Sequence, residues 1–196
     1  MRPVTVSKHI SAPRERVFDF VADLAARPAY SDHYLDDYRL ARPNPIGEGA
    51  SARFRLDTPF LKKEYAELAV AEYDRPRRLV EEIRVGRLGR NRSLAVYEFM
   101  PEAGGLTHLE LSLLSEPATP IDAVKQYLAR GWIKRNAAKS LERLRMIFEE
   151  PPDEPLRRVT IAGWEPVKAP RFGEPAGFDP SRPAPGEPAP GGGSAS

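Results

Sequence analysis

Residues 119–150, TPIDAVKQYLARGWIKRNAAKSLERLRMIFEE, decide the fold because they predict one long amphipathic helix. Thr119 suits the N-cap position and Pro120 suits the first helical position, where no backbone N–H is needed. Proline at position 151 ends the pattern. The predicted buried stripe consists of apolar residues at helical spacing, with Lys, Arg and Glu between them: Ile121, Val124, Leu128, Trp132, Ala138, Leu141, Leu144 and Phe148.

The residues before this helix predict a curved antiparallel sheet of about six to seven strands. Apolar and polar residues alternate along several short runs, for example along residues 50–56 and 106–114. Turn-forming residues separate the runs, as at 74–77. A sheet with one apolar face needs a cover, and the 119–150 helix is long enough to provide it. We therefore predict an α+β fold in which the sheet wraps the helix and a cavity lies between them.

The composition changes after residue 150. Residues 151–196 hold 11 of the 21 prolines and end in GGGSAS, which is typical of a disordered, low-complexity segment. Residues 156–164, LRRVTIAGW, are apolar and favour a strand. We expect one domain at 1–150 and a Pro/Gly-rich tail at 151–196. The tail would dock on the domain near 156–164 and be disordered towards its end. The alternative is that the tail binds a protein partner.

Composition and charge exclude several classes of function. With 30 Lys and Arg against 28 Asp and Glu, the net charge of +2 does not favour nucleic-acid binding. The chain has no cysteine, which excludes disulfides and thiol catalysis. No apolar run approaches the roughly 20 residues of a membrane span, and the first residues lack a signal peptide's apolar region. We expect a cytoplasmic protein without stable membrane insertion.

Four short motifs precede the long helix in a fixed order: VTVSKHISAPRERVFD at 4–19, GEG at 47–49, DRPRRL at 74–79 and GGLT at 104–107. Together with that helix they resemble the START/SRPBCC superfamily, and more narrowly its bacterial polyketide cyclase/dehydrase and lipid-transport group. The resemblance covers residues 4–150 and implies a helix-grip fold. It also implies a cavity for a lipid, sterol, polyketide or aromatic compound. Some members catalyse cyclisation or dehydration, but no family catalytic motif carries over to this sequence.

Glu81 is the first candidate catalytic residue. Strand alternation places it on the same face as Leu79 and Ile83. A carboxylate facing an apolar cavity has a raised pKa and suits general acid/base catalysis. Arg135 on the covering helix is its predicted partner. The alternatives are a bulge that turns Glu81 outward and a purely structural salt bridge.

His33 is the second candidate catalytic residue, because Asp32 and Asp36 flank it near the predicted cavity mouth. The alternative is an ordinary residue of a helix-to-strand loop. The other histidines, His9 and His108, stand on separate elements without metal-ligand spacing. A nucleophile elbow and a phosphate-binding glycine loop are both absent. We expect no metal and no cofactor.

The predicted ligand-binding residues are positions on the strands and the long helix that face the cavity, together with tyrosines of the segment near its mouth. They are Tyr30, Tyr34, Phe54, Leu68, Ile83, Tyr97, Leu111, Leu128, Trp132 and Arg135. We expect a binding protein for a small hydrophobic or aromatic ligand, lipid- or polyketide-like. The first alternative is a cyclase or dehydratase that uses general acid/base catalysis on a polyketide-like substrate. The second is an interaction protein that uses its Pro-rich tail.

Overall fold

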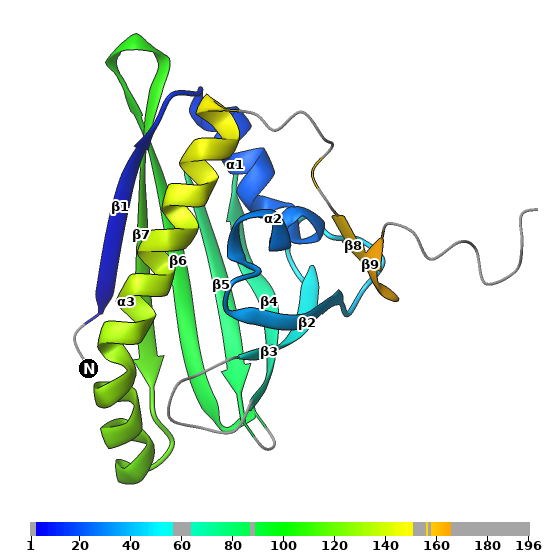
Figure 1. The fold of residues 1–196 in the computed structure, drawn as a ribbon, viewed down its shortest axis with the longest axis vertical. Coiled ribbons are helices and arrows are strands. Elements are labelled where there is room, and N and C mark those ends of the chain that lie inside the picture. Colours follow the sequence, from blue (N-terminus) through cyan, green and yellow to red (C-terminus); the bar gives the residue numbers. More distant parts are fainter. Residues whose placement is uncertain (1–2, 57–63, 87–88, 151–155, 157, 166–196) are drawn as a thin grey trace, which may run out of the picture. The chain divides into compact units, whose positions relative to one another are not determined.

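The computed structural model describes residues 3–56, 64–86, 89–150, 156 and 158–165, and these residues form the predicted α+β fold (Figure 1). Seven strands make one antiparallel sheet in the order β1-β7-β6-β5-β4-β3-β2. Their bounds are β1 Val4–Ile10, β2 Leu35–Leu40, β3 Ser51–Leu56, β4 Glu64–Asp74, β5 Arg78–Val85, β6 Asn91–Glu102 and β7 Leu106–Glu116. The sheet is curved and not closed, with β1 and β2 as its edges.

The helices fall into a short group after β1 and one long helix after β7. The group consists of α1 (Arg14–Ala22), the 3-10 turn η1 (Leu24–Ala26) and α2 (Pro28–Ser31), and the long helix is α3 (Pro120–Glu149). Thr119 caps α3 as predicted, because its Oγ1 accepts a hydrogen bond from the Asp122 backbone N–H at 3.2 Å. No helix in these described segments is long and apolar enough to cross a membrane.

The core lies between the inner face of the sheet, α1 and the C-terminal half of α3. Phe18 of α1 is fully buried, and its ring meets the rings of Tyr73 and Phe99 edge-on, each with a centroid distance of 5.1 Å. In the same core, the side chains of Leu141 and Leu144 of α3 are 1% and 0% exposed. This packing fixes α1 and the end of α3 on the same part of the sheet.

The predicted buried stripe of α3 is wrong in the first half of the helix. Ile121, Val124 and Leu128 are 69%, 60% and 63% exposed. The inner face there carries Asp122, Gln126 and Ala129 instead. The physical reason is that this half lies over a cavity and not over close-packed side chains, so burial does not require apolar residues on one continuous stripe.

After α3, a small hairpin of β8 (Arg158–Thr160) and β9 (Gly163–Glu165) follows. Val159 is 2% exposed and belongs to the main core. Arg158 Nη1 lies 2.6 Å from Oδ2 of Asp23, at the start of η1. The predicted disorder towards the end of the tail falls on residues outside the described part of the chain.

Candidate ligand-binding cavity

A cavity of about 220 Å³ lies between the inner face of the sheet and the N-terminal half of α3. Apolar side chains from β2 to β7 make most of its wall, and α3 makes the remaining side. The wall residues are Arg27, Tyr34, Leu35, Phe54, Leu56, Leu68, Glu81, Ile83, Val85, Ala95, Tyr97, Leu111 and Leu113. Glu64, Asn91, Ser93 and Ser115 lie where the strands end, towards the start of α3. A polar rim therefore surrounds one end of an apolar chamber.

The cavity face of α3 follows helical spacing and is polar at its start. Asp122, Gln126, Ala129, Ile133 and Ala137 recur every three or four residues along it. Lys125, Trp132 and Asn136 widen the same face. Polar and small residues therefore line the cavity along the first turns of α3, and the larger apolar Trp132 and Ile133 follow further along the helix.

A buried ion pair between Arg27 and Glu81 stands in the cavity wall. The Arg27 guanidinium donates through both Nη atoms to the Glu81 carboxylate, with Nη1 3.2 Å from Oε2. Nη1 also donates to the Tyr97 hydroxyl at 2.7 Å, and Nη2 donates to the Val21 carbonyl at 3.3 Å. The Arg27 and Glu81 side chains are only 4% and 1% exposed. Their mutual neutralisation is what makes two charges tolerable at this depth.

The local backbone explains how Arg27 reaches this position. It ends η1 and directly precedes Pro28 of α2, so the chain turns at this residue. Its backbone N–H donates to the Leu24 carbonyl, which fixes the turn. The side chain then points from the helical segment towards the sheet, where Glu81 of β5 faces inward. The sequence analysis did not identify Arg27; the missed signal was that a buried Glu81 requires a cation.

Glu81 faces the cavity despite an irregularity in the neighbouring strand. The register between β4 and β5 shifts between the pairs Val70–Glu81 and Glu72–Val80, so the extra residue is on β4. Glu81 therefore keeps the inward orientation that strand alternation predicts, and it is fully buried. Burial raises the pKa of the Glu81 carboxyl, while the adjacent Arg27 guanidinium opposes that shift.

Tyrosines surround the Arg27 guanidinium. Its carbon lies 5.5 Å from the centre of the Tyr30 ring and 5.4 Å from that of Tyr97. Burial raises the pKa values of the Tyr30, Tyr38 and Tyr97 phenols, so all three stay protonated. Among the described residues, the Tyr30 and Tyr38 hydroxyls and Arg27 Nε have no hydrogen-bond partner. Hydrogen-bonding capacity is therefore left over around the ion pair.

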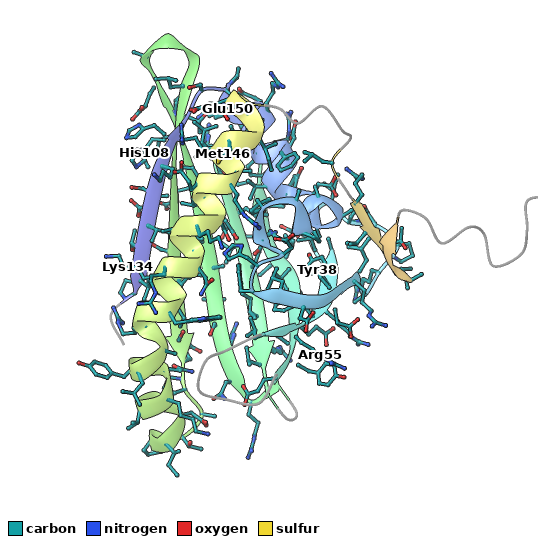
Figure 2. All side chains as sticks on the ribbon, viewed as in Figure 1. Tyr38, Arg55, His108, Lys134, Met146 and Glu150 are labelled. Atoms are coloured by element: carbon teal, nitrogen blue, oxygen red, sulfur yellow. The ribbon has the colours of Figure 1, made fainter. Side chains whose placement is uncertain are left out.

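The cavity wall includes most of the residues that the sequence placed there. Glu81 and seven of the ten predicted binding residues line it: Tyr34, Phe54, Leu68, Ile83, Tyr97, Leu111 and Trp132. Figure 2 shows Tyr38 on β2. Its ring stacks on that of the wall residue Phe54, with a centroid distance of 5.8 Å. Tyr34 and Trp132 of the wall meet edge-on, with 6.2 Å between their ring centres.

Three predicted binding residues and one predicted catalytic residue lie elsewhere. Tyr30 is buried behind Arg27, and Leu128 and Arg135 are on exposed parts of α3. The expected pairing of Glu81 with Arg135 is wrong, because Arg27 occupies both carboxylate oxygens. His33 is outside the described cavity lining.

His33 instead connects α2 to α3. Its Nε2 is 3.3 Å from the Asn136 carbonyl, and its Nδ1 is 3.3 Å from Arg143 Nη1. Arg143 can only donate, so Nδ1 accepts and the ring is neutral with its proton on Nε2. Burial lowers the pKa of His33, in agreement with a neutral ring. This position does not favour the predicted proton-transfer role.

The fold and the site together define a class of protein. In this class a curved antiparallel sheet packs around one long helix, and an apolar cavity lies between them; here an ion pair is buried in the cavity wall. The sequence profile of the family described as "Polyketide cyclase / dehydrase and lipid transport" matches residues 1–149. The chain therefore belongs to that family. No curated protein matches the sequence significantly.

Solved structures share the fold at low sequence identity. TTHA0849 from Thermus thermophilus is 23% identical, with a TM-score of 0.58, and the match covers 73% of this chain and 94% of that one. KanY protein (ms6282) is 15% identical, with a TM-score of 0.60 and coverages of 75% and 97%. DynU16, a putative protein in the dynemicin biosynthetic locus, is 17% identical, with a TM-score of 0.53 and coverages of 76% and 48%.

Proposed function

We propose that this protein binds a small hydrophobic or aromatic molecule, polyketide-like in character, in the cavity between the sheet and α3. The observation that carries the proposal is the apolar chamber with one internal polar point, the cluster of Arg27, Glu81 and Tyr97. Apolar walls supply affinity and a few fixed polar groups supply orientation, which is the usual design of a small-molecule site. Family membership supports the same conclusion.

The size of the cavity favours a compact ligand. Its volume of about 220 Å³ is below the range of about 300–1,000 Å³ for typical ligand pockets. Aromatic side chains on two sides, Tyr34 with Trp132 and Phe54, suit the faces and edges of a flat ring system. The ligand's polar group would lie near the Tyr97 hydroxyl and Arg27. A compact ring system fits these features better than a long acyl chain.

A matched pair of substitutions on α3 tests the proposal. Ala129 lines the cavity, whereas Ala123 of the same helix does not, and both are partly buried. The probe is N-phenyl-1-naphthylamine, a neutral aromatic dye whose fluorescence rises in apolar surroundings. We expect saturable binding by the wild-type protein, loss of at least about tenfold in affinity for Ala129→Phe, and wild-type binding by Ala123→Phe. Absence of binding, or equal binding by both variants, would refute the proposal.

A second candidate function, proton transfer by Glu81, is favoured by one observation. The Glu81 carboxyl lines the cavity, is fully buried, and has a pKa raised by burial. Such a group suits removal of a proton next to a carbonyl, the step that cyclisation and dehydration of polyketides require. Arg27 would then hold the carboxylate in place and stabilise it, which limits its basicity.

Hydrogen–deuterium exchange tests this candidate without knowledge of the substrate. The probe is 2-tetralone, a compact bicyclic ketone with exchangeable protons next to its carbonyl. If Glu81 transfers protons, the wild-type protein accelerates deuterium incorporation in D₂O, and Glu81→Gln loses that acceleration while it still binds the dye. Equal exchange rates for the two proteins would leave ligand binding as the function of the cavity.

A further inference from the structure

Two histidines that are far apart in the sequence are direct neighbours on the outer face of the sheet. His9 of β1 is paired with His108 of β7 in the strand register. Directly opposed residues in an antiparallel pair place their side chains on the same face. The neighbouring Ile10 and Leu109 are fully buried on the inner face, so the two imidazoles lie on the face opposite to the cavity.

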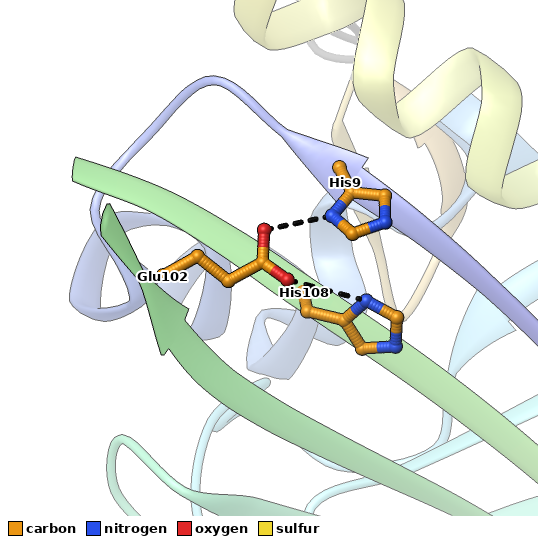
Figure 3. Close-up of side chains that lie close together, drawn as sticks. All are labelled: His9, Glu102 and His108. Carbon is orange, nitrogen blue, oxygen red and sulfur yellow. Dashed lines mark hydrogen bonds and ion pairs between the residues drawn. The ribbon is translucent and has the colours of Figure 1, made fainter. Parts of the chain in front are cut away.

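Glu102 completes a cluster with the two histidines. It lies at the end of β6, the strand that pairs with β7 on the other side from β1. Figure 3 shows its carboxylate beside the two rings, with Oε2 2.8 Å from Nδ1 of His9 and Oε1 3.7 Å from Nδ1 of His108. The ring centroids are 4.7 Å apart. One potential ligand atom from each of the three side chains lies within 4.8 Å of the others.

We propose that His9, His108 and Glu102 form a binding site for a divalent transition-metal ion, with zinc as the best match. Two imidazole nitrogens and one carboxylate oxygen are a preferred ligand set for zinc, which leaves one coordination position for water. The chain has no cysteine that would compete for the ion. The site is separate from the cavity and does not depend on the function proposed for it.

The geometry needs a small adjustment that the side chains allow. Tetrahedral ligands at about 2.0–2.1 Å from zinc lie roughly 3.3 Å from one another. At present Oε2 of Glu102 lies 2.8 Å from Nδ1 of His9, and its other oxygen, Oε1, lies 3.7 Å from Nδ1 of His108, so a small rotation of the carboxylate or of a ring is enough to bring one oxygen and both nitrogens to that spacing. The His9 side chain is 62% exposed, so its ring is free to rotate towards an ion.

The backbone that carries the three ligands is already fixed. β1, β7 and β6 are neighbouring strands, and the β6–β7 turn contains Gly104 and Gly105 at φ values of +78° and +76°, which favour glycine. Buried Thr107 donates a hydrogen bond from Oγ1 to the Ala12 carbonyl at 2.6 Å, which ties the start of β7 to the chain after β1. A preformed backbone lowers the entropy that metal binding would otherwise have to overcome.

The competing explanation is that Glu102 only forms surface contacts with the two histidines and that no ion binds there. Exposed pairs of this kind contribute little to stability. That explanation predicts no saturable metal binding. His33 provides an internal control, because it is the third histidine of the chain and lies on another element, where it contacts Asn136 and Arg143.

Calorimetric titration of the tag-free, chelator-treated full-length protein with zinc chloride at neutral pH tests the site. We expect one ion per chain. His9→Ala and His108→Ala should each lose at least about tenfold in affinity, a loss typical of perturbing even outer-shell partners of a metal. His33→Ala should bind as the wild type does. All three variants keep their strands and helices by circular dichroism if the losses are specific.

A second measurement uses linkage between binding and folding. An ion that binds only the folded state raises the midpoint of thermal unfolding, and the rise disappears when its ligands are removed. Zinc should therefore raise the midpoint of the wild type and of His33→Ala, but not that of the His9→Ala/His108→Ala double variant. No saturable zinc binding, or binding that survives in the double variant, would overturn the proposal.

Discussion

Both halves of α3 mix apolar with charged residues, but the C-terminal half packs in the core and the N-terminal half covers the cavity. In the C-terminal half, Leu141 and Leu144 are buried in the core, and Glu142 holds Lys8 of β1 with 2.7 Å between the charged atoms. In the N-terminal half, Val124 and Leu128 are 60% and 63% exposed. One half therefore anchors the helix to the sheet, and the other covers a cavity.

The difference shows how one helix can both stabilise a fold and leave room for a ligand. Close packing at one end supplies the free energy that keeps the helix in place. Because that end is secured, the other end can present Gln126, Ala129 and Asn136 to a space that they do not fill. The same substitution made in each half of α3 should therefore change the free energy of unfolding by different amounts.

The largest effect is expected at the ion pair in the cavity wall. Arg27→Met leaves the buried Glu81 carboxylate without its partner, and breaking a buried pair in this way costs about 3–5 kcal/mol. The double variant Arg27→Met/Glu81→Leu should recover most of that loss, because no charge is left uncompensated. Urea unfolding measures both. If the single variant is as stable as the wild type, the ion pair between Arg27 and Glu81 does not contribute to the stability of the fold.

The next effect tests the anchored half of α3. Leu144→Ala removes a fully buried side chain from the core and should lower the free energy of unfolding by about 2–5 kcal/mol. The same urea titration gives the value. If Leu144→Ala lowers the free energy of unfolding by less than about 1 kcal/mol, the view that this half holds the helix on the sheet is wrong.

A smaller effect should appear in the pH dependence of stability. Hydrogen bonds from Arg145 and Lys8 lower the pKa of Glu142 to about 2 from its ordinary value of 4.5. Its contribution is fully present above pH 4.5 and is lost as the pH falls towards 2. Because the group is partly exposed, we expect less than about 1 kcal/mol. Glu142→Gln should therefore show a shallower acid decline in unfolding free energy than the wild type, and parallel declines would exclude this anchor.

The smallest effect is expected in the covering half. Leu128→Ala makes the same chemical change as Leu144→Ala at a position that is 63% exposed. The free energy of unfolding should stay within about 0.5 kcal/mol of the wild type. A loss comparable to that of Leu144→Ala would mean that the two halves of α3 are packed alike in solution.

Much of the fold could be predicted from local patterns. Alternating runs predicted the strands, and the proline, N-cap and spacing signals predicted α3 with the correct N-cap at Thr119. The same helical pattern failed for the exposed stripe at Ile121, Val124 and Leu128, because periodicity identifies an apolar face but not what lies opposite to it. The predicted Glu81 orientation agrees with the structure because strand alternation is a local property.

Partnerships between distant residues could not be predicted in the same way. Arg27 and Glu81 are 54 positions apart, and no local pattern connects a helix end to a strand residue. Sequence reasoning therefore paired Glu81 with Arg135. His9 and His108 likewise lie on separate elements, and only the pairing of β1 with β7 brings them together.

The sequence by itself determined the order of the elements, the long helix, the single apolar face of the sheet and the family. These follow from spacing within a few residues, which the backbone geometry of helices and strands imposes directly. Only the tertiary structure decided which half of α3 is buried, which cation neutralises Glu81 and which histidines share a carboxylate. Those outcomes depend on sheet order and register, because strand pairing brings residues dozens of positions apart into contact.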